Sequence, residues 1–194
     1  MGCVLGEEFA PRLAAARDGD DEGFAALWRE LQPPLLRYLS VASGDAAEDL
    51  ASETWIRVAR DLGSFTGDER GFRSWVFTIA RHRLLDWRRH EGRARTVPRP
   101  LERLDGRATA DPAGEALERL ATDAALQLIA RLPADQAEVV ILRAVAGLDV
   151  ASAARVLGKR PGAVRVLAHR GLRRLAELLA VESSDDPGPG VVTP

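Results

Sequence analysis

Cysteine, lysine, tyrosine and long apolar runs are scarce or missing in this chain of 194 residues. The single cysteine, Cys3, excludes an internal disulfide framework and a cysteine-rich zinc site. No run of about 18 apolar residues occurs, so we expect no membrane span and no membrane contact of the chain's own. Residues 1–10 carry two glutamates where a secretion signal needs basic and then apolar residues, which favours a cytoplasmic protein.

The residues that are abundant favour helices. Hydrophobic residues make up 46% of the chain, enough for a core, and aromatic residues only 5%. Alanine, leucine and arginine dominate, and valine and isoleucine rarely cluster. The composition therefore predicts an all-α fold.

The net charge of −2 hides an alternation along the sequence. Residues 1–63 hold 12 acidic and 6 basic residues, whereas residues 64–100 hold 4 acidic and 9 basic ones. Residues 121–180 are again basic, with 9 basic against 5 acidic residues. Two basic segments on an acidic chain indicate two contacts with a polyanion and one contact of opposite sign. All basic residues but Lys159 are arginines, which suits phosphates and guanine edges, although a codon bias explains the excess equally well.

Apolar spacing predicts helices through most of the first half. The stretch Glu22–Leu39 has the helical period, and two prolines, Pro33 and Pro34, are expected to break it into two helices. A second helix should run from an N-cap at Asp45 to about residue 62. After a polar loop over residues 63–71, Phe72–His90 is again helical, with two tryptophans expected in the core.

The interval Gly92–Gly114 differs from its flanks because it combines prolines, glycines and mixed charges. It predicts a flexible linker between two small helical domains. The expected division is an N-terminal extension (1–19), a first helical domain (20–92), the linker (93–119), a second helical domain (120–180) and a disordered tail (181–194).

The second domain contains a helix-turn-helix pattern. A helix over residues 133–146 should precede a short one capped by Asp149 and ending at Leu157, with a turn at Gly158 and a last helix over residues 162–180. Small residues at Ala153, Ala154 and Gly171 would let the last two helices cross closely. Residues 150–176 contain no acid, which supports DNA contact by the second helix, although a solvated hairpin that is basic by chance is the alternative.

Three segments together resemble one family. They are Glu48–Arg60 (EDLASETWIRVAR), Phe72–Arg89 (FRSWVFTIARHRLLDWRR) and Arg131–Arg143 (RLPADQAEVVILR), the last leading into the helix-turn-helix. Their order and spacing resemble the RNA polymerase sigma factors of the sigma-70 family, most of all the short extracytoplasmic-function (ECF) group. The resemblance covers residues 20–92 and 120–179.

The resemblance implies that the acidic helix docks on the clamp helices of the polymerase β′ subunit. The alternative is that acids merely favour a helix N-terminus, which explains Glu48 and Asp49 but not Glu53. The polymerase-binding residues implied are Glu48, Asp49, Ser52, Glu53, Ile56, Arg57 and Arg60.

The next helix would face the promoter −10 element, and Phe65, the loop Thr66–Arg70 and Phe72 resemble the loop that captures a flipped base. Thr78 and Ile79 stand where primary sigma factors carry a tryptophan pair, which implies weaker DNA melting. Asparagine is common in the family where this chain has His82. The −10 residues implied are Phe65, Phe72, Arg73, Arg81, His82, Arg83, Arg88 and Arg89.

The helix-turn-helix would read the −35 element. Its second helix reads GAVRVLAHRGL over Gly162–Leu172, where the family often reads GTVKSRLHRAR, so we expect a non-standard −35 sequence. Further implied partners are the polymerase β flap, promoter DNA and an anti-sigma factor. The −35 residues implied are Arg155, Lys159, Arg160, Gly162, Ala163, Arg165, Val166, His169, Arg170, Arg173 and Arg174.

Other functions fit less of the chain. The three histidines have no cysteine partners and no glycine-rich phosphate loop occurs, so we expect no enzyme, no cofactor and no metal site. His82 and Asp86 have a spacing that could bind a metal, but a surface hydrogen bond is the simpler interpretation. A helix-turn-helix regulator that does not join the polymerase explains the C-terminal half and leaves the N-terminal motif unexplained, and a helical sigma decoy or regulator is a third hypothesis.

Overall fold

The computed structural model describes residues 5–91 and 123–184, with no side-chain detail beyond residue 180. Every regular element in these ranges is helical, which confirms the all-α prediction. The interval 92–122, which contains the expected linker, lies outside the described residues, as does the chain from residue 185. The disordered tail was expected from residue 181, but residues 181–184 are instead the end of the last helix. The helices are α1 (Phe9–Arg17), α2 (Asp21–Ser43), α3 (Ala47–Asp61), α4 (Glu69–Glu91), a helical stretch over residues 123–130, α6 (Ala134–Ala144), α7 (Val150–Leu157) and α8 (Pro161–Ser184).

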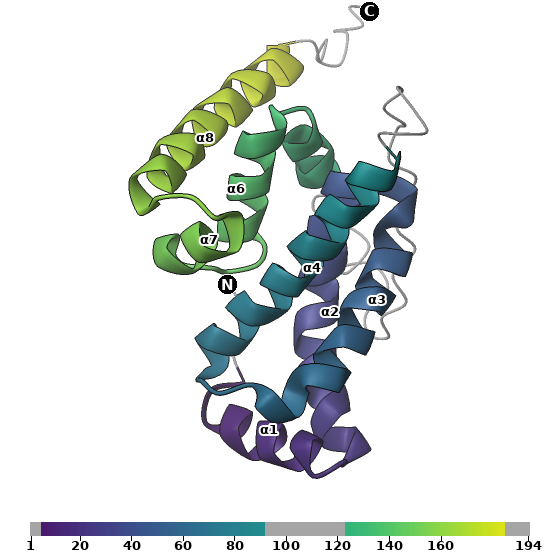
Figure 1. Cartoon of the computed structure of the whole chain (residues 1–194). Helices are drawn as coiled ribbons and strands as arrows, with labels where there is room; N and C mark the ends of the chain where they lie inside the picture. The colour runs from purple at the N-terminus through teal and green to yellow at the C-terminus, as the bar shows by residue number, and fades with distance from the viewer. Residues whose placement is uncertain (1–4, 92–122, 185–194) are drawn as a thin grey trace, which may run out of the picture.

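The N-terminal region is a bundle of α2, α3 and α4, with α1 lying across one end (Figure 1). We did not predict α1. Phe9 and Leu13, four residues apart on one face, are buried, and the Phe9 ring centroid lies 5.6 Å from that of Phe72 on α4, while α1 as a whole packs on α2. The crossing is tight at Gly23, where a Cβ atom would lie 2.8 Å from the backbone nitrogen of Ala16. A side chain at this position would push α1 away from α2.

The prediction that Pro33 and Pro34 divide α2 is wrong, because the helix continues from Asp21 to Ser43 with both prolines inside it. Each proline removes one helical hydrogen bond, at a cost of roughly 3 kcal/mol. Apolar side chains are buried on both sides of the pair, among them Leu31 and Leu35. Each such leucine contributes roughly 1.5–3 kcal/mol, so packing outweighs the break.

The start of α3 also differs from the prediction. The expected cap, Asp45, lies in a 3₁₀ turn over Gly44–Ala46, and Ala46 occupies the N-cap position without a side-chain hydrogen bond. Gly44 adopts a positive φ of 59°, which lets the chain enter this extra turn. The first turn of α3 still carries Glu48 and Asp49, which suit the positive end of the helix dipole.

The C-terminal region contains the predicted helix-turn-helix. Asp149 caps α7 by accepting the Ser152 backbone N–H at 2.7 Å, and Gly158 ends the helix in the left-handed conformation. Gly171 supports a different crossing from the one expected. A Cβ atom there would lie 2.7 Å from the Cγ2 atom of Val140, so this glycine lets α8 approach α6 rather than α7.

The two regions pack against each other. α7 lies on α4, and α6 lies on α2 (Figure 1). Buried residues of both regions belong to one hydrophobic cluster, and the two tryptophans expected in the core, Trp75 and Trp87, pack against it. Independent movement of the two domains stays a prediction. No helix among the described residues is both long and apolar enough to cross a membrane.

Candidate polymerase and nucleic-acid interfaces

The outer face of α3 carries the seven residues expected to bind the polymerase. The opposite face packs into the bundle through Leu50, Thr54 and Val58. Ile56 is 60% exposed, which leaves an apolar side chain on a polar surface. Arg57 pairs with Asp61 on the same helix. All seven expected residues are exposed: Glu48, Asp49, Ser52, Glu53, Ile56, Arg57 and Arg60.

The outer face of α8 is similarly open. Val164 is fully buried and Gly171 is also buried, and together they hold the helix on its scaffold. Val166 and Leu172 are large apolar side chains left about half exposed. The expected −35 residues are all exposed: Arg155, Lys159, Arg160, Gly162, Ala163, Arg165, Val166, His169, Arg170, Arg173 and Arg174. No acidic residue lies among them.

Three expected −10 residues are not on the surface. Phe72 is 2% exposed and Arg73 is 8% exposed, so neither can contact DNA in this arrangement. Phe65 is also buried, with its ring centroid 5.1 Å from that of Trp75 in a stacked geometry and 5.3 Å from that of Phe72. The aromatic residues therefore form a core cluster, and the exposed residues of the loop are 63, 64, 66–68 and Arg70.

Arg73 is held by an acid far away in the sequence. Its Nη2 atom lies 2.8 Å from Oε1 of Glu30 on α2, and both side chains are nearly buried. Its Nη1 atom lies 3.4 Å from the carbonyl oxygen of Ala146, which follows α6. This arginine therefore joins the two regions, which the sequence pattern did not indicate.

Arg81 is engaged in the same way, through Glu138 on α6. Its Nε atom donates to Oε1 of Glu138 at 2.9 Å, and the Tyr38 hydroxyl donates to the same oxygen at 3.0 Å. Burial, and then the nearby Glu138 carboxylate, raise the pKa of Tyr38, so its hydroxyl keeps its proton. We did not predict this site. The only available signal was the lone tyrosine, which falls on the buried face of α2.

The C-terminal half of α4 is more open. His82 and Arg89 are exposed, and Arg83 and Arg88 are half buried. Arg88 donates to the carbonyl oxygen of Ala42 at 2.9 Å, and both Arg83 and Arg89 pair with Asp86 on the same helix. The described residues include no group of three or more side chains that could hold a metal ion.

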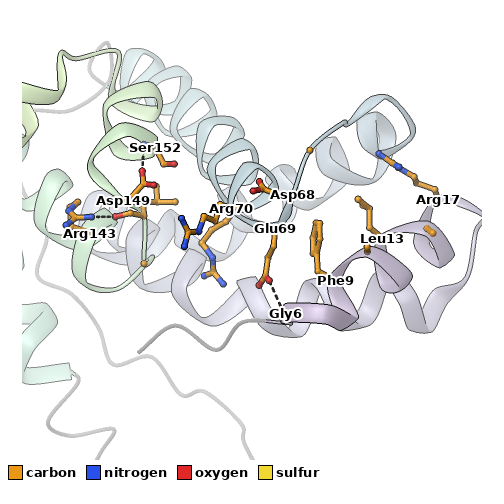
Figure 2. A pocket seen from close by; sticks show the side chains of 16 residues that line it. Gly6, Phe9, Leu13, Arg17, Asp68, Glu69, Arg70, Arg143, Asp149 and Ser152 are labelled. Carbon is orange, nitrogen blue, oxygen red and sulfur yellow. Dashed lines mark hydrogen bonds between the residues drawn. The ribbon is translucent and has the colours of Figure 1, made fainter.

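The loop before α4 is tied to the N-terminal helix. On one side, the Arg17 guanidinium of α1 donates to the carbonyl oxygens of Leu62, at 3.3 Å, and of Phe65. On the other side, the Glu69 carboxylate accepts the backbone N–H groups of Leu5, at 2.9 Å, and Gly6, at 3.0 Å. Figure 2 shows Arg17 and Glu69 at the two sides of Phe9 and Leu13.

A pocket of about 880 Å³ lies beside these contacts, between α1, the start of α4 and the turn before α7 (Figure 2). Its wall mixes charges of both signs, with Arg70 and Arg143 near Asp68 and Asp149. The Arg143 guanidinium donates to the Leu148 carbonyl oxygen and so closes the turn before α7. The pocket is thus a junction of the two regions.

Two family sequence models match the chain. "Sigma-70 region 2" covers residues 27–94, and "Sigma-70, region 4" covers residues 122–175. The first match contains most of α2 and all of α3 and α4, and the second contains the helix-turn-helix. The helix α1 lies outside both.

Curated relatives carry matching names. "ECF RNA polymerase sigma factor BldN" of Streptomyces coelicolor is 38% identical, over 84% of this chain and 63% of the relative. "ECF RNA polymerase sigma factor SigD" of Mycobacterium tuberculosis H37Rv is 33% identical, over 90% of this chain and 85% of the relative. The chain thus spans less than two thirds of the BldN relative and most of SigD.

A solved structure shares the fold. It is the sigma factor RpoE in complex with the anti-sigma factor NepR from Bartonella quintana, with a TM-score of 0.63 and 24% identity. The similarity covers 81% of this chain and 97% of that one.

Proposed function

Because this chain belongs to the ECF group of the sigma-70 family, we propose that it is an alternative sigma factor that joins core RNA polymerase and directs promoter-specific initiation. In this proposal the outer face of α3 binds the β′ clamp helices. The loop before α4 and the open half of α4 meet the −10 element. The helix-turn-helix binds the −35 element, and its region also contacts the β flap.

One observation carries the proposal. A single chain presents both an exposed face that begins with acids, on α3, and an exposed basic face on α8 that holds no acid before Glu177. The first suits a basic protein surface and the second suits DNA phosphates and base edges. A helix-turn-helix regulator would need only the second. The exposed face of α3, with Ile56 at its centre, has no role in such a regulator.

An anti-sigma factor is a further partner in this proposal. The RpoE relative of known structure is bound to one. The single cysteine gives this chain no internal disulfide switch, so a signal would be sensed by the partner. Affinity capture of the full chain from its native cell should recover an inhibitory partner. A chain that is constitutively active there, with no such partner, would contradict this part.

The central experiment mixes the purified full chain with bacterial core polymerase and a pool of genomic fragments from its source. We expect transcripts that start at a few defined sites only when both components are present. Core enzyme alone is the control for nonspecific starts. If the chain binds DNA but never yields defined starts, the regulator alternative replaces the proposal.

A further inference from the structure

The loop over residues 62–69 is held from several directions. Phe65 is anchored in the aromatic cluster, and its backbone N–H donates to the Leu62 carbonyl oxygen at 3.2 Å. Asp68 accepts the Gly71 backbone N–H at 2.8 Å and so caps the first turn of α4. Gly67 has a φ of 150°, and a Cβ atom there would lie 3.1 Å from the Phe65 ring. The backbone of the exposed tip is therefore tightly determined.

Two of the restraints come from α1 and the turn before it. The Arg17 guanidinium reaches the carbonyl oxygens at both ends of the turn over residues 62–65. A charged donor makes stronger hydrogen bonds than a neutral one, and its fork fixes two acceptors at once. Glu69 binds the backbone before α1, so the two segments hold each other from both sides.

These contacts hold a surface that the proposed function uses. Residues 63, 64 and 66–68 are the exposed part of the loop, and Arg70 is exposed just after it, whereas the neighbouring rings are buried. A loop that must receive an unstacked base binds better when it is already ordered, because less conformational entropy is lost on binding. Contacts from α1 would supply that order.

We propose that α1 is a positioning element for promoter −10 recognition, in which Arg17 fixes the loop over residues 62–69 and Glu69 holds α1 in place. This inference rests on the proposed function. Arg17 acts through the loop backbone and does not itself contact DNA. Its loss should leave the outer faces of α3 and α8 unchanged, because its two hydrogen bonds reach only the backbone of this loop.

Three variants of the full chain separate this role from general stability. Arg17→Ala removes both hydrogen bonds, and Arg17→Lys keeps the charge without the fork. Arg12→Ala is the matched control, because Arg12 lies on the same helix and pairs with Glu8 at 3.7 Å on the surface. If Arg17→Ala is poorly folded, Arg17→Lys decides the question.

The first measurement is amide hydrogen exchange, which requires neither polymerase nor DNA. We expect Arg17→Ala to speed exchange at the Phe65 amide about tenfold, with a smaller increase for Arg17→Lys. Exchange in the middle of α2 should not change, and Arg12→Ala should match the wild type. Unchanged exchange at Phe65 in both Arg17 variants would overturn the inference.

The second measurement is initiation by the reconstituted polymerase on promoters with single-base changes in the −10 element. We expect Arg17→Ala to reduce discrimination among these bases about tenfold, while affinity for core polymerase and −35 preference stay within about twofold of wild type. Arg17→Lys should be intermediate. An Arg17→Ala protein with wild-type −10 discrimination overturns this inference alone, whereas a wild type that never initiates overturns the proposed function and this role with it.

Discussion

The helices α4 and α8 are both rich in arginine, yet the structure uses their arginines differently. Arg73 and Arg81 of α4 are nearly buried in ion pairs with Glu30 and Glu138. The basic residues of α8 all lie on the surface, where Arg173 pairs with Glu177 one turn away. The same residue type thus joins two regions of the protein on one helix and remains available to a partner on the other.

The difference shows what a basic segment does and does not indicate. An arginine at a phosphate-binding position looks the same in sequence as one that pairs inside the protein. Glu30 and Glu138 are 43 and 57 residues away from their partners, so no local pattern reveals the pairing. The test is therefore to replace an acid that pairs with an arginine on each helix and to compare the loss in the free energy of unfolding.

The largest effect is expected at the acid that engages α4. Glu138→Ala would leave the Arg81 guanidinium and the Tyr38 hydroxyl without their shared acceptor in a nearly buried site. We expect the free energy of unfolding to fall by about 2–3 kcal/mol, measured by urea denaturation of the full chain.

Glu177→Ala on α8 is the matched control for that prediction. Its partner Arg173 is 74% exposed, so the loss should stay below about 0.5 kcal/mol. Equal losses of unfolding free energy in Glu138→Ala and Glu177→Ala would show that the ion pairs of α4 and α8 contribute alike to stability. Adding Arg81→Met to Glu138→Ala should recover part of the loss, because the unpaired charge is then removed as well.

The next effect concerns the available arginines. Arg165 lies in the first turns of α8, where recognition helices meet base edges, and Arg173 lies farther along, where a phosphate contact is expected. Arg165→Ala should cost roughly 1–3 kcal/mol of binding free energy and relax preference at the −35 element. Arg173→Ala should weaken binding to all sequences and reduce the salt slope by about one unit.

The measurement for this pair is promoter binding across a panel of −35 substitutions at several salt concentrations. A uniform loss across the panel for Arg165→Ala would make Arg165 a phosphate contact. The arginines of α4 and α8 would then still differ in their exposure. No residue of α8, however, would be assigned to reading the bases of the −35 element.

A smaller effect is expected at Asp149, which caps α7 and lies near Arg70 of α4. Asp149→Ala removes the N-cap of α7 and should cost about 1 kcal/mol, measured by thermal or urea denaturation. The hydrogen bond from Ser152 lowers the pKa of Asp149 from its ordinary 3.8, with a smaller contribution from Arg70 and Arg155. Its stabilising contribution is therefore complete above pH 3.8 and is lost as the pH falls through the lower folded value.

The pH profile provides the control for the Asp149 prediction. Asp149→Asn keeps a capping oxygen but cannot titrate, so it should remain close to the wild type near neutral pH and lose less of its stability in acid. An identical acid profile for wild type and Asp149→Asn would show that Asp149 is not a source of the pH dependence.

The smallest effect on folding is expected on the acidic face. Glu53→Arg on α3 reverses an exposed charge, so the free energy of unfolding should change by less than about 0.5 kcal/mol. Binding to core polymerase should nevertheless weaken, because the new arginine would face a partner surface that is basic and complements the original glutamate. Unchanged affinity in a binding titration with core enzyme would remove Glu53 from that interface.

Local signals predicted much of the fold. The helix-turn-helix was predicted closely, because Asp149 and Gly158 act through the backbone next to them. The outward faces of α3 and α8 also followed from helical periodicity. Where the outcome depended on distant contacts, prediction failed. Packing keeps α2 continuous through its prolines. A close crossing at Gly23 of α2 stabilises α1, and the short sequence of α1 itself does not indicate this contact.

The same reason explains the −10 residues. The sequence places Phe72 and Arg73 beside a loop, where exposure is the ordinary expectation. Their burial depends on aromatic neighbours and on a second region that is far away along the chain. No periodicity within one helix carries that information.

The tight packing of α8 on α6 has an evolutionary consequence. Val164 and Gly171 attach the helix to its scaffold, and Gly171 has no room for even one more carbon atom. Exposed neighbours such as Arg165 and Val166 take no part in that attachment, and surface substitutions usually change stability by less than about 0.5 kcal/mol. A lineage could therefore exchange the outward residues one at a time and acquire a new promoter preference without passing through an unfolded intermediate. The inward residues would have to stay fixed throughout.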